Sequence, residues 1–182
     1  MNIPNILETK RLIIRPFNTE DINPFISFMI NKEATKYISF TEEEKTPEGA
    51  EALIQSIINS YCTQNSVFTL AITQKEAGIY LGSCGLTPIK RNIEAECFYV
   101  LLPKYWGNGY AIECIKKLFD YAFNELQLSK IIAHIKPRNT RSWKTAERAG
   151  MKYMGQVRLE NLPSEAMLFS IERSDFEVQR EL

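Results

Sequence analysis

The alternation of apolar and polar positions along the chain predicts a set of short β-strands. Residues 12–15 begin a strand that Pro16 closes. Residues 151–160 and 165–172 predict a last hairpin, whose turn falls at residues 161–163. Further strands are expected where apolar or weakly alternating runs occur, at residues 67–73, 79–89, 94–102 and 130–135.

Apolar residues at helical spacing predict helices between these strands. Thr19 is expected to cap the first helix, with Glu20 and Asp21 in its first turn, where carboxylates complement the helix dipole. Thr46 and Pro47 mark a second helix start, because proline at the first helical position loses no needed hydrogen bond. The helical pattern that follows includes Leu53, Ile54, Ile57, Ile58 and Tyr61.

Two more helices and one short helical piece complete this prediction. The strongest helical pattern runs over residues 111–126, and a shorter helix over residues 140–149 ends at Gly150. Residues 32–37 predict a short helical piece, and residues 41–46 a polar loop. The apolar side of the strongest helix is formed by Ala111, Ile115, Leu118, Phe119, Ala122, Phe123 and Leu126.

Glycines and polar residues place the turns. Residues 76–78 and 92–93 predict hairpin turns, and Gly82 and Gly85 lie inside a strand, where glycine often marks a bulge or a close backbone approach. The predicted order is β-α-α-β-β-β-α-β-α-β-β. This order indicates an α/β (α+β) fold with a mostly antiparallel mixed sheet flanked by helices, in one domain over residues 1–182.

A glycine loop joins a strand to the strongest helix. The apolar run at residues 97–102 stops at Pro103, and Gly107 and Gly109 precede the helix expected from Ala111. Glycines allow a positive φ and a close ligand approach, and the first amides of a helix attract anions, most often phosphate. The alternative is an ordinary glycine-containing turn.

Composition narrows the function classes. Lys and Arg together number 22, as do Asp and Glu, so the zero net charge gives no global sign of nucleic-acid binding. The chain has 4 cysteines without a C-x-x-C pair and 1 histidine, His134, so neither a metal site nor a disulfide framework is expected. No apolar run is long enough to span a bilayer and no signal peptide is evident, so a soluble, cytoplasmic protein is expected.

The glycine loop resembles a motif of one enzyme family. Residues 106–111 (Trp-Gly-Asn-Gly-Tyr-Ala) are similar to the pyrophosphate loop, Gln/Arg-x-x-Gly-x-Gly/Ala, of the GCN5-related N-acetyltransferases (GNAT fold). Gly107 and Gly109 occupy the glycine positions. Lys104 stands where Gln or Arg is usual, and lysine can still meet phosphate as a point charge.

Three other stretches resemble the RimJ/RimL-type ribosomal-protein N-terminal acetyltransferase branch. Residues 7–17 are similar to its opening strand, and residues 167–176 to its closing strand and tail. Residues 139–142 (Asn-Thr-Arg-Ser) and 149–151 (Ala-Gly-Met) are similar to its Asn-x-x-Ser helix start and its Gly-Phe end. The motifs occur in the expected order over nearly the whole chain.

The resemblance implies an acetyl-CoA site. The loop would bind the pyrophosphate, and a splayed pair of central strands, residues 96–102 and 130–135, would admit the pantetheine arm. Backbone at residues 100–102 would pair with that arm and polarise the acetyl carbonyl. The resemblance assigns to acetyl-CoA the residues Val100, Leu101, Leu102, Lys104, Trp106, Gly107, Asn108, Gly109, Tyr110, Ala111, Asn139 and Ser142. Trp106 and Tyr110 also suit packing of the loop onto the sheet.

Asn139 and Ser142 begin the helix that follows the second of these strands. Asn139 suits a capping role, and the family resemblance adds a contact to the cofactor arm. Many GNAT enzymes place a thiolate-protonating tyrosine where this chain has Ala146. The RimJ/RimL-type branch instead has a serine at Ser142, which would bond to or protonate the sulfur; a plain first-turn serine is the alternative.

A carboxylate near the slot is expected to take the amine proton, directly or through water. The candidates are Glu96, at the start of its strand, and Glu160, at a strand end near the acceptor mouth. Glu96 is alternatively a structural partner of a nearby donor, and Glu160 a hairpin-edge charge. His134, alone on a strand, is more often structural.

The expected function is transfer of the acetyl group of acetyl-CoA to a primary amine in a ternary complex, without a metal. The acceptor is a protein N-terminus or a small amine such as an amino sugar, antibiotic, amino acid or polyamine. A weakly catalytic acyl-CoA sensor and an unrelated phosphate-binding protein are the competing classes; the second lacks a G-x-x-x-x-G-K-[ST] motif. A homodimer is a candidate assembly, and neither nucleic-acid nor membrane partners are expected.

Overall fold

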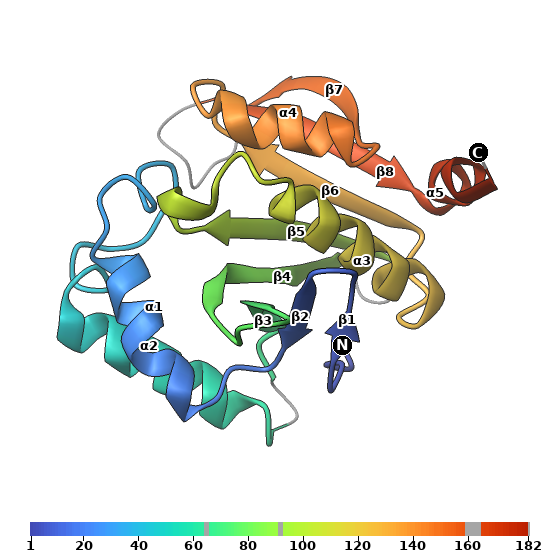
Figure 1. Cartoon of the computed structure of the whole chain (residues 1–182). Helices are drawn as coiled ribbons and strands as arrows, with labels where there is room; N and C mark the ends of the chain where they lie inside the picture. The colour runs from blue at the N-terminus through green and yellow to red at the C-terminus, as the bar shows by residue number, and fades with distance from the viewer. Residues whose placement is uncertain (64–65, 91–92, 159–164, 182) are drawn as a thin grey trace. The chain divides into compact units, whose positions relative to one another are not determined.

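The computed structural model describes residues 1–63, 66–90, 93–158 and 165–181, and its eight strands belong to one mixed, mostly antiparallel sheet (Figure 1). The strand order is β1-β2-β3-β4-β5-β6-β8-β7. This arrangement confirms the predicted fold class. By internal contacts the chain divides into a first unit (Met1–Gly85 and Tyr99–Cys114) and a second unit (Leu86–Phe98 and Ile115–Leu182).

The first unit contains antiparallel strands and two packed helices. The chain starts with β1 (Leu7–Glu8) and β2 (Leu12–Arg15), which pair with each other, and β2 pairs with β3 (Thr69–Gln74). Next to β3 lies β4 (Tyr80–Lys90), which continues into the second unit. The helices α1 (Ile22–Met29) and α2 (Pro47–Ser60) pack side by side (Figure 1).

The helices bury part of the predicted apolar pattern: in α2, Ile54 and Ile57 are buried, whereas Leu53, Ile58 and Tyr61 are half-buried. Phe25, Phe28 and Met29 of α1 form one core cluster with Ala50, Ile54 and Ile57 of α2. Phe17, Ala71 and Tyr80 complete this cluster from the chain before α1 and from the sheet. Burial of such side chains is the main favourable term in folding, at about 1.5–3 kcal/mol for each large one.

Cap positions explain where the helices begin. Thr46 caps α2 by accepting the Gly49 N–H, with Pro47 at the first helical position, as predicted. The cap predicted before α1 is wrong by one residue. Asn18, not Thr19, caps the short 3₁₀ helix η1 (Thr19–Asp21) that leads into α1. Asn18 is the cap because its own N–H also donates to the Asp21 side chain, which completes a capping box.

One other local prediction for the first unit is wrong. Residues 32–37 form turns rather than a helical piece; Asn31 starts them by accepting the N–H groups of Glu33 and Ala34 with its side chain. The strand predicted at residues 12–15 is confirmed with the same bounds as β2, and β1 precedes it as a separate short strand. The predicted hairpin turn between β3 and β4 is confirmed, and Gly78 there has φ of +66°.

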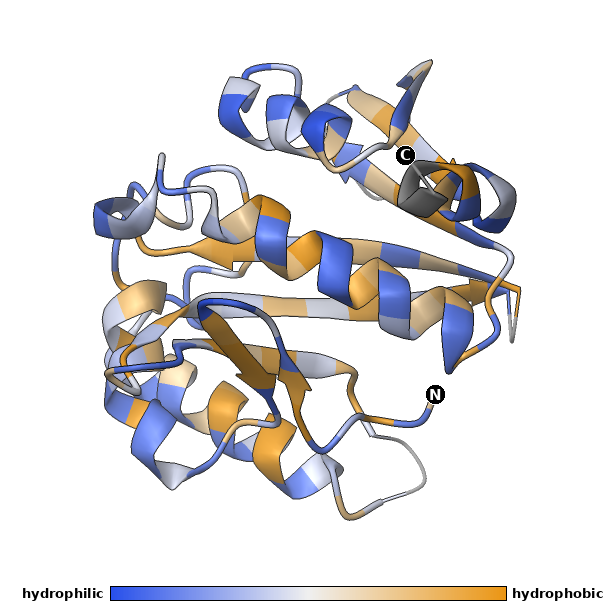
Figure 2. Ribbon diagram, turned by 45° about the vertical axis from the view of Figure 1, so that its right-hand side comes forward, coloured by the Kyte–Doolittle hydropathy of each residue, from blue (hydrophilic) through white to orange (hydrophobic). Residues whose placement is uncertain are grey.

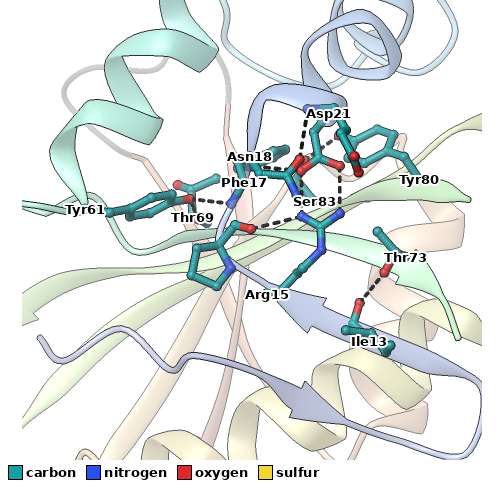
Figure 3. A network of polar contacts seen from close by, with 12 residues as sticks. Ile13, Arg15, Phe17, Asn18, Asp21, Tyr61, Thr69, Thr73, Tyr80 and Ser83 are labelled. Atoms are coloured by element: carbon teal, nitrogen blue, oxygen red, sulfur yellow. Dashed lines mark hydrogen bonds and ion pairs between the residues drawn. The ribbon is translucent and has the colours of Figure 1, made fainter. Parts of the chain in front are cut away.

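A buried polar network crosses the core of the first unit (Figure 3). Arg15 donates two hydrogen bonds to the buried carboxylate of Asp21, of 2.6 Å and 3.1 Å. Tyr61 donates to the Thr69 carbonyl and accepts the Phe17 N–H at 3.2 Å, and burial raises the pKa of Tyr61 to about 12. The ion pair with Arg15 stabilises the buried Asp21 carboxylate, since an unpaired buried carboxylate would greatly lower the stability of the fold.

The second unit contains the other end of the sheet. The first part of β5 (Glu94–Leu101) runs parallel to β6 (Lys130–Ile135), and β8 (Ala166–Glu172) pairs antiparallel with both β6 and β7 (Lys152–Val157). The predicted turns before β5 and between β7 and β8 fall in part or wholly at residues 91–92 and 159–164, outside the described residues.

Three helices follow the sheet strands along this part of the chain. Hydrophilic and hydrophobic residues recur at helical spacing along α3 (Tyr110–Asn124), most of which belongs to the second unit (Figure 2). Next comes α4 (Thr140–Arg148), which stops at Gly150 with φ of +100°, as predicted. The last helix, α5 (Arg173–Glu181), was not predicted; Arg173 anchors its start by donating two hydrogen bonds to the Leu128 carbonyl.

The cysteines remain thiols. Cys62 is exposed, whereas Cys84, Cys97 and Cys114 are buried, and none of the 4 forms a disulfide.

Candidate functional site

The glycine loop of the first unit has the backbone that its sequence predicts. After β5 the chain forms a 3₁₀ turn, η2 (Pro103–Tyr105), and then reaches the loop. Gly107 and Gly109 have φ of +79° and +78°, a region that side chains rarely adopt. A Cβ at Gly107 would meet nothing within 4 Å, so conformation rather than space requires glycine there. The helix starts at Tyr110, one residue before the predicted position.

Side chains of the loop fix its shape. Trp106 donates its indole N–H to the Leu101 carbonyl at 2.8 Å, and Asn108 donates its side-chain amide to the carbonyls of Tyr105 and Trp106, each at 3.2 Å. Lys104 is exposed, with its ammonium 4.9 Å from the centre of the Tyr105 ring. The packing role that the sequence suggested for Trp106 is therefore present.

The loop ends in amide groups that face away from the helix body. The Glu113 N–H donates to the Gly109 carbonyl at 3.1 Å, closing the first turn of α3. The amides that precede Glu113 in the helix have no intrahelical acceptor by geometry, and the helix dipole adds about half a positive charge there. Exposed glycines followed by such amides suit a phosphate group.

The strand before the loop passes very close to its neighbour. A Cβ at Gly82 of β4 would lie 2.0 Å from the Val100 carbonyl oxygen, so glycine is required by the close approach that the sequence suggested. Next to Gly82, the Leu81 carbonyl accepts the Leu102 N–H at 2.9 Å. Among the amides expected to meet the pantetheine arm, that of Leu102 therefore already has a partner inside the first unit.

In the second unit, the parallel pairing of β5 with β6 joins Glu94–Glu96 to Lys130–Ile132. Beyond this paired segment, Nδ1 of His134 and Oε1 of Glu96 are hydrogen-bonded at 2.9 Å. The His134 side chain is 14% exposed and that of Glu96 36%, so the pair is largely but not wholly shielded. Glu96 thus has the nearby donor that its structural interpretation required.

Asn139 and Ser142 lie at the start of α4 in the second unit. Asn139 is the N-cap residue, and its side-chain oxygen accepts the Ser142 N–H at 3.3 Å. The capping role predicted for Asn139 is confirmed. Ala146, which stands at the family's tyrosine position, is fully buried, and its methyl side chain supplies no hydroxyl there.

The predicted site residues therefore form two groups, each described within its own unit. Residues 100–111 form one continuous segment in the first unit, and Glu96, Asn139 and Ser142 belong to the second unit. Glu160 lies outside the described residues.

The sequence did not predict that Arg11 contacts the loop, or that Thr9 and Arg11 both bond to the first turn of α3. Arg11 donates to the Asn108 carbonyl at 3.0 Å, and both residues bond to Glu113 of α3. The sequence carries no local signal for these contacts, because Arg11 and Glu113 are 102 positions apart.

The described residues contain neither a cluster of metal ligands nor a helix suited to a bilayer. No group of three or more His, Cys, Asp or Glu side chains there is arranged to hold a metal ion. None of the described helices combines the length and the apolar character that a bilayer crossing requires.

Comparison with known proteins identifies the family. Residues 11–152 match the model of the acetyltransferase (GNAT) domain. The chain is 33% identical over 153 residues to p20, an uncharacterised N-acetyltransferase of Bacillus licheniformis, across 84% of this chain and 85% of p20. The chain belongs to the GNAT acetyltransferase family.

Solved structures agree with the fold. A ribosomal-protein-S5-alanine acetyltransferase of Vibrio fischeri aligns with a TM-score of 0.75 at 18% identity, over 94% of this chain and 98% of that one. A spermidine N-acetyltransferase of Vibrio cholerae, solved with CoA and spermine, aligns with a TM-score of 0.76 at 20% identity, over 93% of this chain and 99% of that one. The protein is thus an acetyl-CoA-dependent N-acetyltransferase with the GNAT fold.

Proposed function

We propose that the protein acetylates a primary amine by direct transfer from acetyl-CoA in a ternary complex, with a protein N-terminus as the first acceptor class to test. The proposed binding of acetyl-CoA rests on one observation: two positive-φ glycines, Gly107 and Gly109, lie directly before α3. Acetyl-CoA supplies an acetyl group activated as a thioester.

The donor-binding residues follow from this loop. Its exposed glycines and the first amides of α3 suit the pyrophosphate, and Lys104 adds a nearby exposed positive charge. Backbone of Val100 and Leu101 is assigned to the pantetheine arm. The Leu102 N–H is the weaker candidate, because it already donates to the Leu81 carbonyl.

Ser142 and Asn139 are assigned to the reacting end of the donor. The Ser142 hydroxyl would donate a hydrogen bond to the sulfur as the carbon–sulfur bond breaks, and thereby favour the thiolate as leaving group. Asn139 would contact the arm with the part of its side chain that does not cap α4. This assignment rests on resemblance to the RimJ/RimL-type branch and on the absence of a hydroxyl at Ala146.

The amine proton needs an acceptor before attack on the acetyl carbon. Glu96 is one candidate, and its contact with His134 offers a route for that proton: an ionised Glu96 accepts from Nδ1–H, which leaves Nε2 of a neutral ring as a proton acceptor. Glu160 and water are the other candidates. No covalent acetyl-enzyme is required: Cys84, Cys97 and Cys114 are buried, and the exposed Cys62 is not among the residues assigned to the donor.

Two proteins of similar fold support the choice of acceptor class: one is a ribosomal-protein-S5-alanine acetyltransferase and the other a spermidine N-acetyltransferase. At these identities the likeness extends to the fold alone. A small-molecule amine therefore stands as the second candidate acceptor, favoured by the spermidine enzyme.

An acceptor screen tests the proposal. The protein is incubated with acetyl-CoA and a panel of peptides beginning with Ala, Ser or Met, and separately with spermidine and amino sugars, while release of the CoA thiol is followed. Peptide-dependent release with acetylation of the α-amine supports N-terminal transfer; release only with small amines selects the second acceptor class. CoA binding without release for any acceptor would indicate a sensor and overturn the enzymatic proposal.

A further inference from the structure

Arg11, in the turn between β1 and β2, reaches across the first unit to the glycine loop. Its Nη1 donates to the Asn108 carbonyl at 3.0 Å, and its guanidinium carbon lies 4.6 Å from the centre of the Tyr110 ring. Its Nη2 would lie 3.5 Å from a Cβ at Gly109. One guanidinium therefore touches three consecutive residues at the point where loop becomes helix.

The contact with Asn108 controls the direction of a loop amide. In a trans peptide the C=O and the following N–H point in opposite directions, and the described backbone contains no cis peptide. Because Arg11 holds the Asn108 oxygen, the N–H of Gly109 points away from Arg11. The positive φ of Gly109 then turns the chain into the first turn of α3, whose amides precede the Glu113–Gly109 bond.

Glu113 in turn holds Arg11. Its Oε2 accepts from Arg11 Nε at 2.7 Å, while its Oε1 accepts the Arg11 backbone N–H at 2.8 Å and the Thr9 hydroxyl at 2.6 Å. Burial alone would raise the pKa of Glu113, but the hydrogen bonds from Thr9 and Arg11 outweigh it and hold the pKa below its usual value. Glu113 therefore stays ionised, and its charge is neutralised by Arg11 rather than directed at an incoming anion.

We propose that Arg11 is a positioning residue for the pyrophosphate of acetyl-CoA: anchored by Glu113 and Thr9, it fixes the Asn108 carbonyl so that the Gly109 amide faces the phosphate. This proposal rests on the proposed donor site in the glycine loop. It adds a cation, on the far side of the loop from the ligand, that sets the loop conformation before binding. Preorganisation of this kind raises affinity by removing the cost of ordering the loop.

A purely structural tie between the β1–β2 turn and α3 is the competing explanation, and it predicts a different response. Loss of a structural tie lowers stability and affects all ligands alike. Loss of a positioning residue weakens only ligands that contain the pyrophosphate. The comparison therefore needs donors with and without that group.

The test measures binding by calorimetry of CoA and of pantetheine, which lacks the phosphates, to the wild type, Arg11→Ala, Arg11→Lys and Glu113→Gln. Arg11→Ala should weaken CoA binding roughly ten- to a hundredfold, the value of a charge-assisted hydrogen bond, and leave pantetheine binding unchanged. Arg11→Lys should be intermediate, because an ammonium keeps the charge but cannot meet Glu113 and Asn108 in the same fork geometry. The KM for acetyl-CoA should rise while kcat changes little.

Lys75→Ala is the matched control. It removes the Lys75–Glu8 ion pair of 2.7 Å, which joins β1 to the β3–β4 turn in the same unit with similar exposure, 42% for Lys75 against 43% for Arg11. This variant should bind CoA as the wild type does. Should Arg11→Ala fold poorly, Glu113→Gln provides the readout, and weaker binding of CoA with unchanged binding of pantetheine is expected.

The outcomes are distinct. Unchanged CoA affinity in folded Arg11→Ala, or equal loss for CoA and pantetheine, overturns the positioning role while the donor site stands. A wild type that binds neither CoA nor inorganic pyrophosphate overturns the donor site and the positioning role together.

Discussion

His134 of β6 and Glu96 of β5 are hydrogen-bonded to each other where the parallel β5–β6 pairing ends, with Nδ1 and Oε1 2.9 Å apart. This contact lies within the second unit. From the sequence, Glu96 was a candidate base and His134 a structural histidine, and nothing indicated that the two side chains meet. A carboxylate bonded to an imidazole orients the ring and stabilises it when it gains a proton. The contact therefore extends the hypothesis that Glu96 is the general base to a Glu96–His134 pair.

The base hypothesis predicts an altered pH–rate profile. Glu96→Gln should lower kcat roughly a hundredfold and flatten the acidic limb, because the amide can no longer take the amine proton or stabilise a protonated His134. His134→Asn should do the same if the proton passes through the ring. Glu94→Gln, on the same strand and 3.9 Å from Lys130, is the matched control and should retain the limb. Glu160→Gln is the parallel test, and a limb kept in both Glu96→Gln and Glu160→Gln would leave water as the acceptor.

Ser142→Ala should reduce turnover more than acetyl-CoA affinity. Loss of the hydroxyl removes a donor to the leaving thiolate, for which a kcat decrease of roughly a hundredfold is expected, with a CoA dissociation constant close to that of the wild type. Single-turnover kinetics and calorimetry separate the two quantities. Thr145→Ala is the control, because the Thr145 hydroxyl bonds within α4 to the Arg141 carbonyl. Turnover equal to the wild type would remove Ser142 from catalysis.

Gly107→Ala and Gly109→Ala should each cost about 1–2 kcal/mol of stability, since alanine is strained at positive φ. Both should also weaken CoA binding roughly tenfold or more, because relief of the strain turns the loop amides away from the phosphate. Gly78→Ala is the control: Gly78 has φ of +66° in an open hairpin turn, so it shares the strain but not the site. Equal CoA affinity in all three variants would contradict phosphate binding by the loop.

The buried tyrosines predict a loss of stability in alkali. Burial raises the pKa of Tyr61 to about 12 from about 10 in an unfolded chain, so protonated Tyr61 favours the native state. Its contribution should be fully present below about pH 10 and should fall as the pH rises towards 12. Burial raises the pKa of Tyr80 as well, with the same sign.

The urea midpoint, measured from pH 8 to 11, checks this dependence. Tyr61→Phe should lower the urea midpoint at pH 8, because the hydrogen bonds to Phe17 and Thr69 are lost. Above pH 10 the midpoint of this variant should decline less steeply than that of the wild type. Tyr153→Phe, at a tyrosine that is 47% exposed, should decline as the wild type does. Parallel curves for the wild type and Tyr61→Phe would refute the assignment.

Local periodicity was sufficient for much of the fold. The strand Lys130–Ile135 is confirmed with the same bounds, and α2 and α4 begin where proline and asparagine signals place them. These elements depend on contacts within a few residues. The cap of η1 shows the limit of such signals, since Asn18 and Thr19 are both good caps and the return bond from Asp21 decides between them.

Other misses involve partners that are distant in sequence. Arg11 and Glu113 are 102 positions apart, and neither periodicity nor composition indicates that they meet. The start of α5 depends on Arg173 reaching Leu128, 45 positions away. For the candidate site, the loop conformation was predicted, because two glycines before a helix constrain it locally. The hydrogen bond between Glu96 and His134 was not predicted, because it depends on the register in which two strands pair.

The distribution of thiols has a practical consequence for work in solution. With Cys62 exposed and the other three cysteines buried, a maleimide dye added to the native protein should attach at one position, just after α2. A single dye at this place reports on the first unit without any cysteine being introduced or removed. The same selectivity limits the background in thiol-detection assays to one fast-reacting group per chain, which is small beside the CoA released over many turnovers.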